Sequence, residues 1–277
     1  AQETQFIVIT HNRGTIEADT GTINVLANAF RNEGVAKATG GTLNLSSGTN
    51  SNDAGAQLQV TGGTLTTSGN WQLAGGAQIS GGTLNLGGTF DATGFGGFVA
   101  SGGVVNFIGS VDNSGETLTL GAGPTEWVLS NGSIQGGTLQ IEAGERLLVA
   151  DGTRSSRLDA VTVEGNIDLG DNSTLRLKDV AIDGRVTLPD TTYYGYASLA
   201  FEGTQTLGGH AEIVSTDTGG YYYNTLEMLG EGELTLGADV RVHGRGLNIG
   251  NALTSGAVTL QRLVNRGTIE ADRKSVV

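Results

Sequence analysis

A glycine-led phrase of six residues recurs along this chain and limits its possible folds more than any other feature. The phrase is GGTLNL at residues 40–45 and again at 81–86, with the variants GGTLTT, GGVVNF and GGTLQI at residues 62–67, 102–107 and 136–141. The octapeptide NRGTIEAD also occurs twice, at residues 12–19 and 265–272. Self-similarity with a period of roughly 20 residues and no helical pattern is typical of a solenoid, in which each repeat forms one coil.

The phrase itself alternates between polar and aliphatic residues. In GGTLNL, Thr42 and Asn44 face one side while Leu43 and Leu45 face the other. This period of two predicts β-strands whose aliphatic side chains point into the coil and stack in columns. The same inward pairs are expected at Leu84/Leu86, Val105/Phe107, Leu118/Leu120, Leu139/Ile141, Ile167/Leu169, Leu175/Leu177, Val186/Leu188, Leu234/Leu236, Leu247/Ile249 and Val258/Leu260.

Composition agrees with short strands joined by many tight turns. Glycine accounts for 47 of the 277 residues and proline for only 2. Spacings of 19 residues between Gly165, Gly184 and Gly203 extend the period into the second half of the chain. The predicted fold is therefore all-β, a single-stranded parallel β-helix (β-solenoid) with about 20 residues per coil. Right-handed winding is expected, because crossovers between parallel strands are overwhelmingly right-handed.

We expect one continuous solenoid over residues 1–271. Residues 1–140 form Gly/Thr/Asn-rich coils with 9 acidic and 3 basic side chains, and the more charged coils of residues 141–271 carry two tyrosine loops, at 189–196 and 215–224. The apolar run Phe6–Ile9 is expected to lie across the first coil. Residues 272–277, DRKSVV, are interpreted as a non-native tail, because they resemble a translated sequencing adapter.

Charge and residue usage exclude several classes of partner. A net charge of −13 argues against nucleic acid and anionic lipid, and no apolar run is long enough for direct membrane insertion. The chain has no cysteine, its three histidines are scattered, and no loop repeats acidic residues at calcium-ligand spacing. No metal site, cofactor or catalytic residue is therefore predicted.

Four stretches resemble a known family: GTIEA, GGTLNL, LVNRGTIEA and LTLGADVRVHGRG. They are similar to the long β-helical passengers of bacterial surface proteins of the filamentous haemagglutinin and autotransporter type. The resemblance covers nearly the whole chain, but its motifs specify only a scaffold. It implies secretion, an extracellular or outer membrane-associated location, flanking repeats in a longer parent chain, and a role as a rigid stalk or adhesin that meets a glycan or a host or cell-surface protein.

Two other functions remain open. A glycan-active β-helix enzyme of the lyase or hydrolase type would need carboxylates and bases that converge on one outer face. An ice-binding solenoid would need flat outward threonine arrays with Thr42, Thr64, Thr83 and Thr138 as members. Here the next outward position varies among Asn44, Thr66, Asn85, Asn106 and Gln140. The enzyme candidates lie in the charged coils and are Asp151, Arg154, Arg157, Asp159, Asp168, Asp171, Arg176, Lys178, Asp179, Asp183 and Arg185.

The tyrosines give the candidate ligand site. All six lie in the two loops, and the segments after the loops align at a shift of 27 residues, which pairs Leu199 with Leu226 and Phe201 with Met228. This shift predicts that the rings form one platform on adjacent coils, either open to a sugar or a protein or packed on one another. The platform residues are Tyr194, Tyr196, Tyr221 and Tyr223.

Overall fold

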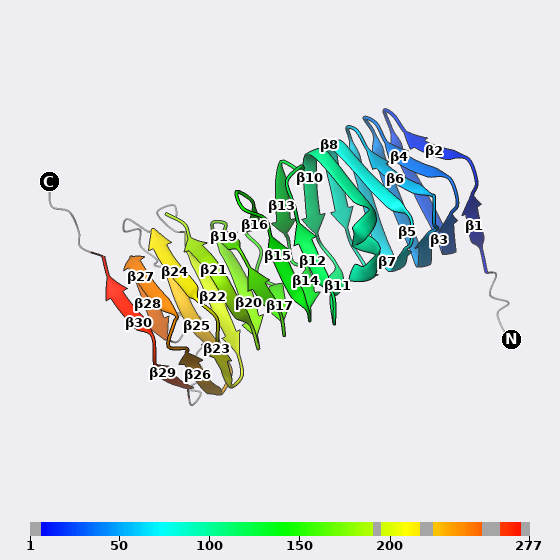
Figure 1. Cartoon of the computed structure of the whole chain (residues 1–277). Coiled ribbons are helices and arrows are strands. Elements are labelled where there is room, and N and C mark those ends of the chain that lie inside the picture. The colour runs from blue at the N-terminus through cyan, green and yellow to red at the C-terminus, as the bar shows by residue number, and fades with distance from the viewer. Residues whose placement is uncertain (1–6, 191–194, 217–223, 251–260, 273–277) are drawn as a thin grey trace, which may run out of the picture. The chain divides into compact units, whose positions relative to one another are not determined.

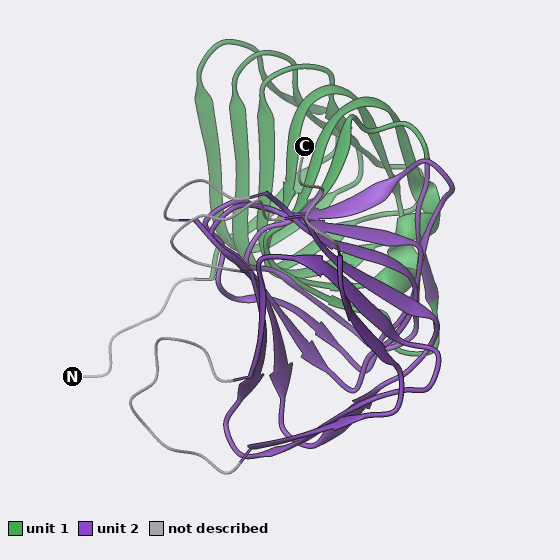
Figure 2. Cartoon of the chain, turned by 90° about the vertical axis from the view of Figure 1, so that its left-hand side faces the viewer, with its two compact units in different colours: residues 1–116, 122–127 green, residues 117–121, 128–277 purple. Residues whose placement is uncertain are grey.

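The computed structural model confirms the predicted fold class. It describes residues 7–190, 195–216, 224–250 and 261–272. The chain is an all-β parallel solenoid whose coils repeat about 21 residues apart. It divides into two compact units, one of residues 1–116 and 122–127 and one of residues 117–121 and 128–277 (Figure 2).

Unit 1 contains parallel strands stacked coil upon coil (Figure 1). Strands β2, β4, β6, β8 and β10 pair in succession, as do β1, β3, β5, β7 and β9. Its elements are β1 (Ile9–Asn12), β2 (Thr15–Ala18), β3 (Thr22–Asn32), β4 (Val35–Ala38), β5 (Thr42–Asn52), β6 (Gln57–Val60), β7 (Thr64–Leu73), β8 (Gly76–Leu86), β9 (Thr89–Asp91), the 3-10 helix η1 (Ala92–Gly97), β10 (Phe98–Phe107) and β11 (Ser110–Asp112); β13 (Glu126–Leu129) begins here.

Unit 2 follows the same plan with shorter strands and longer connections. Strands β14, β17, β20, β22, β25 and β28 form one series, and β16, β19, β21, β24, β27 and β30 another. Its strands are β12 (Thr117–Leu120), β14 (Ser133–Gln135), β15 (Thr138–Ile141), β16 (Arg146–Val149), β17 (Ser156–Asp159), β18 (Thr162–Glu164), β19 (Asn166–Leu169), β20 (Ser173–Lys178), β21 (Ala181–Leu188), β22 (Ala197–Glu202), β23 (Gln205–Leu207), β24 (Ala211–Thr216), β25 (Asn224–Leu229), β26 (Gly232–Leu236), β27 (Arg241–Arg245), β28 (Leu247–Gly250), β29 (Gln261–Asn265) and β30 (Thr268–Ala271).

The aliphatic columns form the core as predicted. Leu43, Leu65, Leu84 and Val105 stack in register on successive coils, and each is fully buried. Burial of each such side chain contributes roughly 1.5–3 kcal/mol, so the columns stabilise the stack without cross-links.

Three expectations fail in detail. Ile249 of the predicted pair Leu247/Ile249 is 36% exposed, and the Val258/Leu260 pair lies outside the described residues. Gly184 pairs with Ala211 and not with Gly203, so this coil is longer than the predicted period of 19 residues. The described part of the apolar run, Ile7–Ile9, does not cover the first coil: Ile7 and Ile9 are 74% and 58% exposed, and Ile9 begins β1 instead, while Phe6 lies outside the described residues.

The glycine pair of the repeated phrase is explained by the close approach of neighbouring coils. A Cβ atom on Gly41, Gly63 or Gly82 would lie closer than 3.0 Å to the carbonyl oxygen of the matching glycine one coil earlier. Gly63 and Gly82 also have positive φ angles, of 62° and 69°. Stacking therefore requires the second glycine of the phrase in all three copies, and backbone conformation also requires it at Gly63 and Gly82.

Buried asparagines form a hydrogen-bonded ladder at one corner of unit 1. Asn12 Nδ2 donates to Asn32 Oδ1, and Asn32 Nδ2 donates to Asn52 Oδ1, each at 2.7 Å. Asn52 Nδ2 in turn donates to the carbonyl of Gly76 at 3.0 Å. The ladder satisfies polar groups that would otherwise be costly to bury.

The two copies of the octapeptide have the same turn. The amide of Gly14 donates to Asn12 Oδ1 at 3.2 Å, and that of Gly267 donates to Asn265 Oδ1 at 3.1 Å. The glutamate of each copy pairs with a cation on the neighbouring coil, Glu17 with Lys37 at 2.9 Å and Glu270 with Arg241 at 2.8 Å. The repeated sequence is thus one coil unit used twice.

An aromatic series runs through the core of unit 1, and sequence periodicity did not predict it. The members are Phe30, Trp71, Phe90, Phe95, Phe107 and Trp127, with neighbouring ring centroids 6.0–6.4 Å apart. Phe95 comes from η1, which interrupts the strand pattern after Asp91. Both tryptophans of the chain belong to unit 1, so tryptophan fluorescence measures the unfolding of that unit, whereas all tyrosines belong to the residue range of unit 2.

Candidate functional site

The ends of the two tyrosine loops are joined by one buried asparagine. Asn224, which begins β25, is 0% exposed. Its Nδ2 atom donates to the carbonyl of Pro189 at 2.8 Å and to Ser215 Oγ at 3.0 Å, and its Oδ1 atom accepts from the amide of Ala197 at 2.8 Å. Pro189 begins the first loop and Ala197 directly follows it, while Ser215 and Asn224 are the first and last residues of the second.

Two further contacts complete this arrangement, which we call the tyrosine-loop base (Leu188, Pro189, Ala197, Ser215, Thr216 and Asn224). Thr216 Oγ1 donates to the carbonyl of Leu188 at 3.1 Å, and Ser215 Oγ donates to the carbonyl of Arg245 at 2.6 Å. The predicted shift of 27 residues is confirmed by the pairing of β22 with β25. The loops therefore leave the solenoid from one shared base.

Of the four predicted platform residues, only Tyr196 lies within the described residues; Tyr194, Tyr221 and Tyr223 lie outside them. The Tyr196 ring is half-buried, and the guanidinium carbon of Arg154 lies 5.9 Å from its centroid. The amides of Arg154 and Ser155 are held by Asn131 Oδ1, at 3.2 and 3.1 Å. This cation–π contact occupies one face of the ring.

The enzyme candidates are only partly brought together. Arg157 and Arg176 lie in register on β17 and β20, and one carboxylate binds both. Glu202, at the end of β22, contacts Arg157 Nη2 at 2.8 Å and Arg176 Nε at 2.6 Å. Sequence analysis missed Glu202, because it reaches the arginines only after the chain has passed through the first tyrosine loop.

Asp159 and Lys178 belong to the same cluster, since Asp159 contacts both Arg157 and Lys178, whereas Asp168 and Asp183 form separate pairs along the outer face. Asp159 contacts Arg157 at 3.1 Å, Asp168 contacts Arg146 at 3.3 Å, and Asp183 contacts His210 at 2.8 Å. Such stacked ion pairs are the expected surface of a solenoid strand that faces water. Each contributes little stability individually.

A buried glutamate lies on the same sheet and was also missed. Glu227 of β25 is 9% exposed, and its carboxylate accepts a 2.6 Å hydrogen bond from Ser198 Oγ. Glu227 is in register with Ala200, two residues from Glu202. Leu226 and Met228 on either side of it are buried in the core, so Glu227 lies on the opposite face of β25 and is still only 9% exposed.

The Asp183–His210 pair gives a prediction for pH titration. The hydrogen bond and the negative charge of Asp183 raise the pKa of the exposed His210 ring, and the same hydrogen bond lowers the pKa of Asp183. The interaction should therefore stabilise the fold below the unfolded pKa of histidine, about 6.5, and be lost as the pH rises through the folded pKa. In an NMR titration, His210 should titrate above the value measured in Asp183→Asn; equal values would show that the pair does not form.

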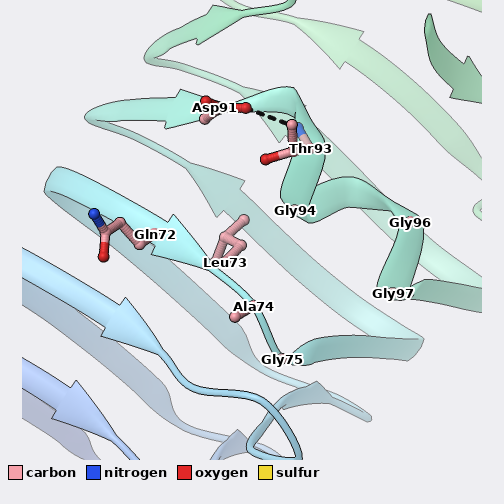
Figure 3. A pocket seen from close by; sticks show the side chains of 9 residues that line it. All are labelled: Gln72, Leu73, Ala74, Gly75, Asp91, Thr93, Gly94, Gly96 and Gly97. Carbon is pink, nitrogen blue, oxygen red and sulfur yellow. Dashed lines mark hydrogen bonds between the residues drawn. The ribbon is translucent and has the colours of Figure 1, made fainter. Parts of the chain in front are cut away.

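A hollow of about 470 Å3 opens in unit 1 where the end of β7 lies beside η1 (Figure 3). Its polar side chains, Gln72, Asp91 and Thr93, are all exposed. Asp91 caps η1, since its Oδ1 atom accepts from the amide of Thr93 at 2.9 Å. We do not interpret the hollow as a binding site, because the carboxylate of Asp91 that lines it already caps η1.

Among the residues that the structure describes, no cluster of histidine and acidic side chains has the arrangement of a metal site. Within the same ranges, no helix is long and apolar enough to cross a membrane. The class that the fold defines is the parallel β-solenoid. Comparison with protein-family models, curated proteins and solved structures returned no match for this chain.

Proposed function

We propose that this chain is a structural and adhesive β-solenoid segment of a large secreted bacterial surface protein, acting as a rigid scaffold and not as an enzyme. The observation that carries the proposal is the tyrosine-loop base, in which Asn224, Ser215 and Thr216 join the ends of two tyrosine-rich loops. Loops on a rigid frame suit recognition, since tyrosine supplies a large contact area at low conformational cost. The partner we infer is a glycan or a host or cell-surface protein.

The location follows from the resemblance to filamentous haemagglutinin and autotransporter passengers. On this proposal the segment lies outside the cell, attached to the bacterial surface and continued by flanking repeats. The outward asparagine side chains, which hydrogen-bond to one another between coils, support a scaffold role. Asn44 donates to Asn24 and Asn106 to Asn85, each at 2.8 Å, so these outward amides bind one another between coils.

The binding proposal is tested on a glycan array with the full chain. The double variant Tyr194→Ala, Tyr221→Ala should lose roughly tenfold in affinity, because each stacked ring contributes about 0.5–1.5 kcal/mol and two rings are removed. The matched variant Tyr194→Phe, Tyr221→Phe retains the rings and should keep most of the binding. Hydrogen exchange in β22 and β25 controls for the fold. Unchanged binding by the alanine variant, or no binding by the parent chain, would contradict this site.

A glycan-active enzyme is the alternative, favoured by one observation. Glu202 lies between Arg157 and Arg176 on an outer face that also carries Glu227. Incubation with acidic polysaccharides separates the two functions: cleavage that is lost in Glu202→Gln would favour the enzyme, and intact polymer would favour the scaffold.

Ice binding is the third candidate. Thr22, Thr42, Thr64 and Thr83 form one in-register outward column in unit 1. The column beside it consists mainly of asparagines that hydrogen-bond to one another, which leaves a single hydroxyl row in place of a flat array. Thermal hysteresis above that of a buffer control would favour this function over the scaffold.

A further inference from the structure

Arg154 is held at a corner of unit 2, beside the end of the first tyrosine loop. Asn131 Oδ1, on the preceding coil, accepts hydrogen bonds from the amides of Arg154 and Ser155 at 3.2 and 3.1 Å, and from Ser155 Oγ at 2.8 Å. The Arg154 guanidinium lies over the ring of Tyr196, the last residue of that loop. The backbone and the side chain of this exposed residue are therefore both positioned.

The guanidinium keeps its hydrogen-bonding capacity in this position. An arginine side chain has five N–H donors, and contact with the face of a ring uses none of them. Among the residues that the structure describes, no acceptor and no carboxylate binds the Arg154 side chain. In contrast, Arg157 and Arg176 on the adjoining strands are both paired with Glu202. Arg154 is therefore a positioned cation that can bind a ligand.

The acidic side chains of the same corner face the backbone. Asp151 Oδ1 accepts a hydrogen bond from the amide of Asp171 at 2.8 Å. The carboxylate of Asp171 lies so close to Gly195 that a Cβ atom there would clash with it. Neither carboxylate forms an ion pair with Arg154, but both reduce the positive potential around it.

These charges limit how many anionic groups a ligand can bring. The chain carries a net charge of −13, which repels polyanions, and Asp151 and Asp171 add to this repulsion at the corner. A single carboxylate that meets Arg154 directly gains the bidentate geometry that a guanidinium offers. The neighbouring tyrosine supplies an apolar ring against which a sugar can pack.

We propose that Arg154 binds a carboxylate on the terminal sugar of a glycan held by the tyrosine loops, so that the loops prefer a terminal uronic acid to a neutral hexose. This inference rests on the proposed function, because it requires that the loops bind a glycan. Tyr196 acts as a positioning residue, since its ring holds the guanidinium beside the loop base.

The test is a glycan array probed with the full chain at low ionic strength. Matched glycans end in a neutral hexose, in the corresponding uronic acid, or in the methyl ester of that acid. We expect the acid to bind about fivefold more tightly than either neutral form, and the preference to shrink at high salt. The ester retains the sugar ring and removes the charge while the protein stays unchanged, so this comparison does not depend on the folding of a variant.

Arg154→Gln should bind the acid no more tightly than the neutral glycans. Arg266→Gln is the matched control, because Arg266 is also exposed and its side chain has neither an ion pair nor a ring contact among the described residues. It removes the same charge and should keep the preference. Hydrogen exchange in β17 and β22 shows whether Arg154→Gln is folded.

The outcomes separate this inference from the proposed function. Equal binding of the three glycan forms by the parent chain, or an unchanged preference in folded Arg154→Gln, overturns the inference and leaves glycan binding in place. Tighter binding of polyglutamate than of the acidic glycan would favour an acidic protein as the partner and also overturns it. A parent chain that binds no glycan overturns both.

Discussion

The Leu84→Asp variant is expected to lose about 4 kcal/mol or more of stability in the coils around β8. Leu84 is 0% exposed and stacks in register between Leu65 and Val105. The substitution removes a buried aliphatic side chain, which costs roughly 2–5 kcal/mol, and places a carboxylate where the column offers only hydrocarbon. Ser80→Asp, an exposed position on the same strand, should change stability by no more than about 0.5 kcal/mol.

Hydrogen exchange and urea unfolding followed by tryptophan fluorescence measure this effect. Because each solenoid coil contacts only its neighbours, protection should fall most in β7, β8 and β10 and least in the distant coils of unit 2. Trp71 and Trp127 both lie in unit 1, so fluorescence should show an earlier transition there. Equal protection in the variant and the parent chain would contradict the column arrangement.

The Gly63→Ala variant is expected to cost about 3 kcal/mol or more, which is large for the addition of one methyl group. Gly63 has a φ angle of 62°, a conformation that costs a side-chain-bearing residue roughly 1–2 kcal/mol. Its new Cβ atom would also press against the backbone of Gly40 and Gly41 on the previous coil. The coils must separate locally to admit it, which weakens the backbone hydrogen bonds between β5 and β7.

Two other glycines separate the causes of this loss. Gly55 has a φ angle of 87° but open space around a new Cβ atom, so Gly55→Ala should cost only about 1 kcal/mol. Gly14 has open space and no positive φ, and Gly14→Ala should lie within about 0.5 kcal/mol of the parent. Thermal unfolding of the three variants gives the comparison. If Gly63→Ala cost no more than Gly55→Ala, the close approach of the coils would not be the cause.

Much of the solenoid could be predicted because its determinants are local. Strand alternation placed Leu43, Leu84 and Ile167 in the core, and all three are fully buried. The shift of 27 residues between the tyrosine segments also held, since Leu199 pairs with Leu226. Both predictions depend on patterns within one or two coils, where side-chain direction follows directly from the strand period.

Less of the candidate site than of the fold could be predicted from the sequence. The two loops and their adjacency were predicted, but Asn224 was not, although its side chain joins both loops. Nothing in the sequence distinguishes this asparagine from the many others of the chain. Its role depends on the positions of the carbonyl of Pro189 and the amide of Ala197, which lie 35 and 27 residues away.

The sequence by itself determined the parallel solenoid, the period of its coils and the residues that fill its aliphatic columns. Only the tertiary structure decided which residues meet between coils: Asn12 with Asn32, Glu202 with two arginines, and His243 with Glu212 and Asp272. The physical reason is the turn between strands. One strand fixes which way its own side chains point, whereas the length of each connection sets the register with the next coil, as the pairing of Gly184 with Ala211 demonstrates.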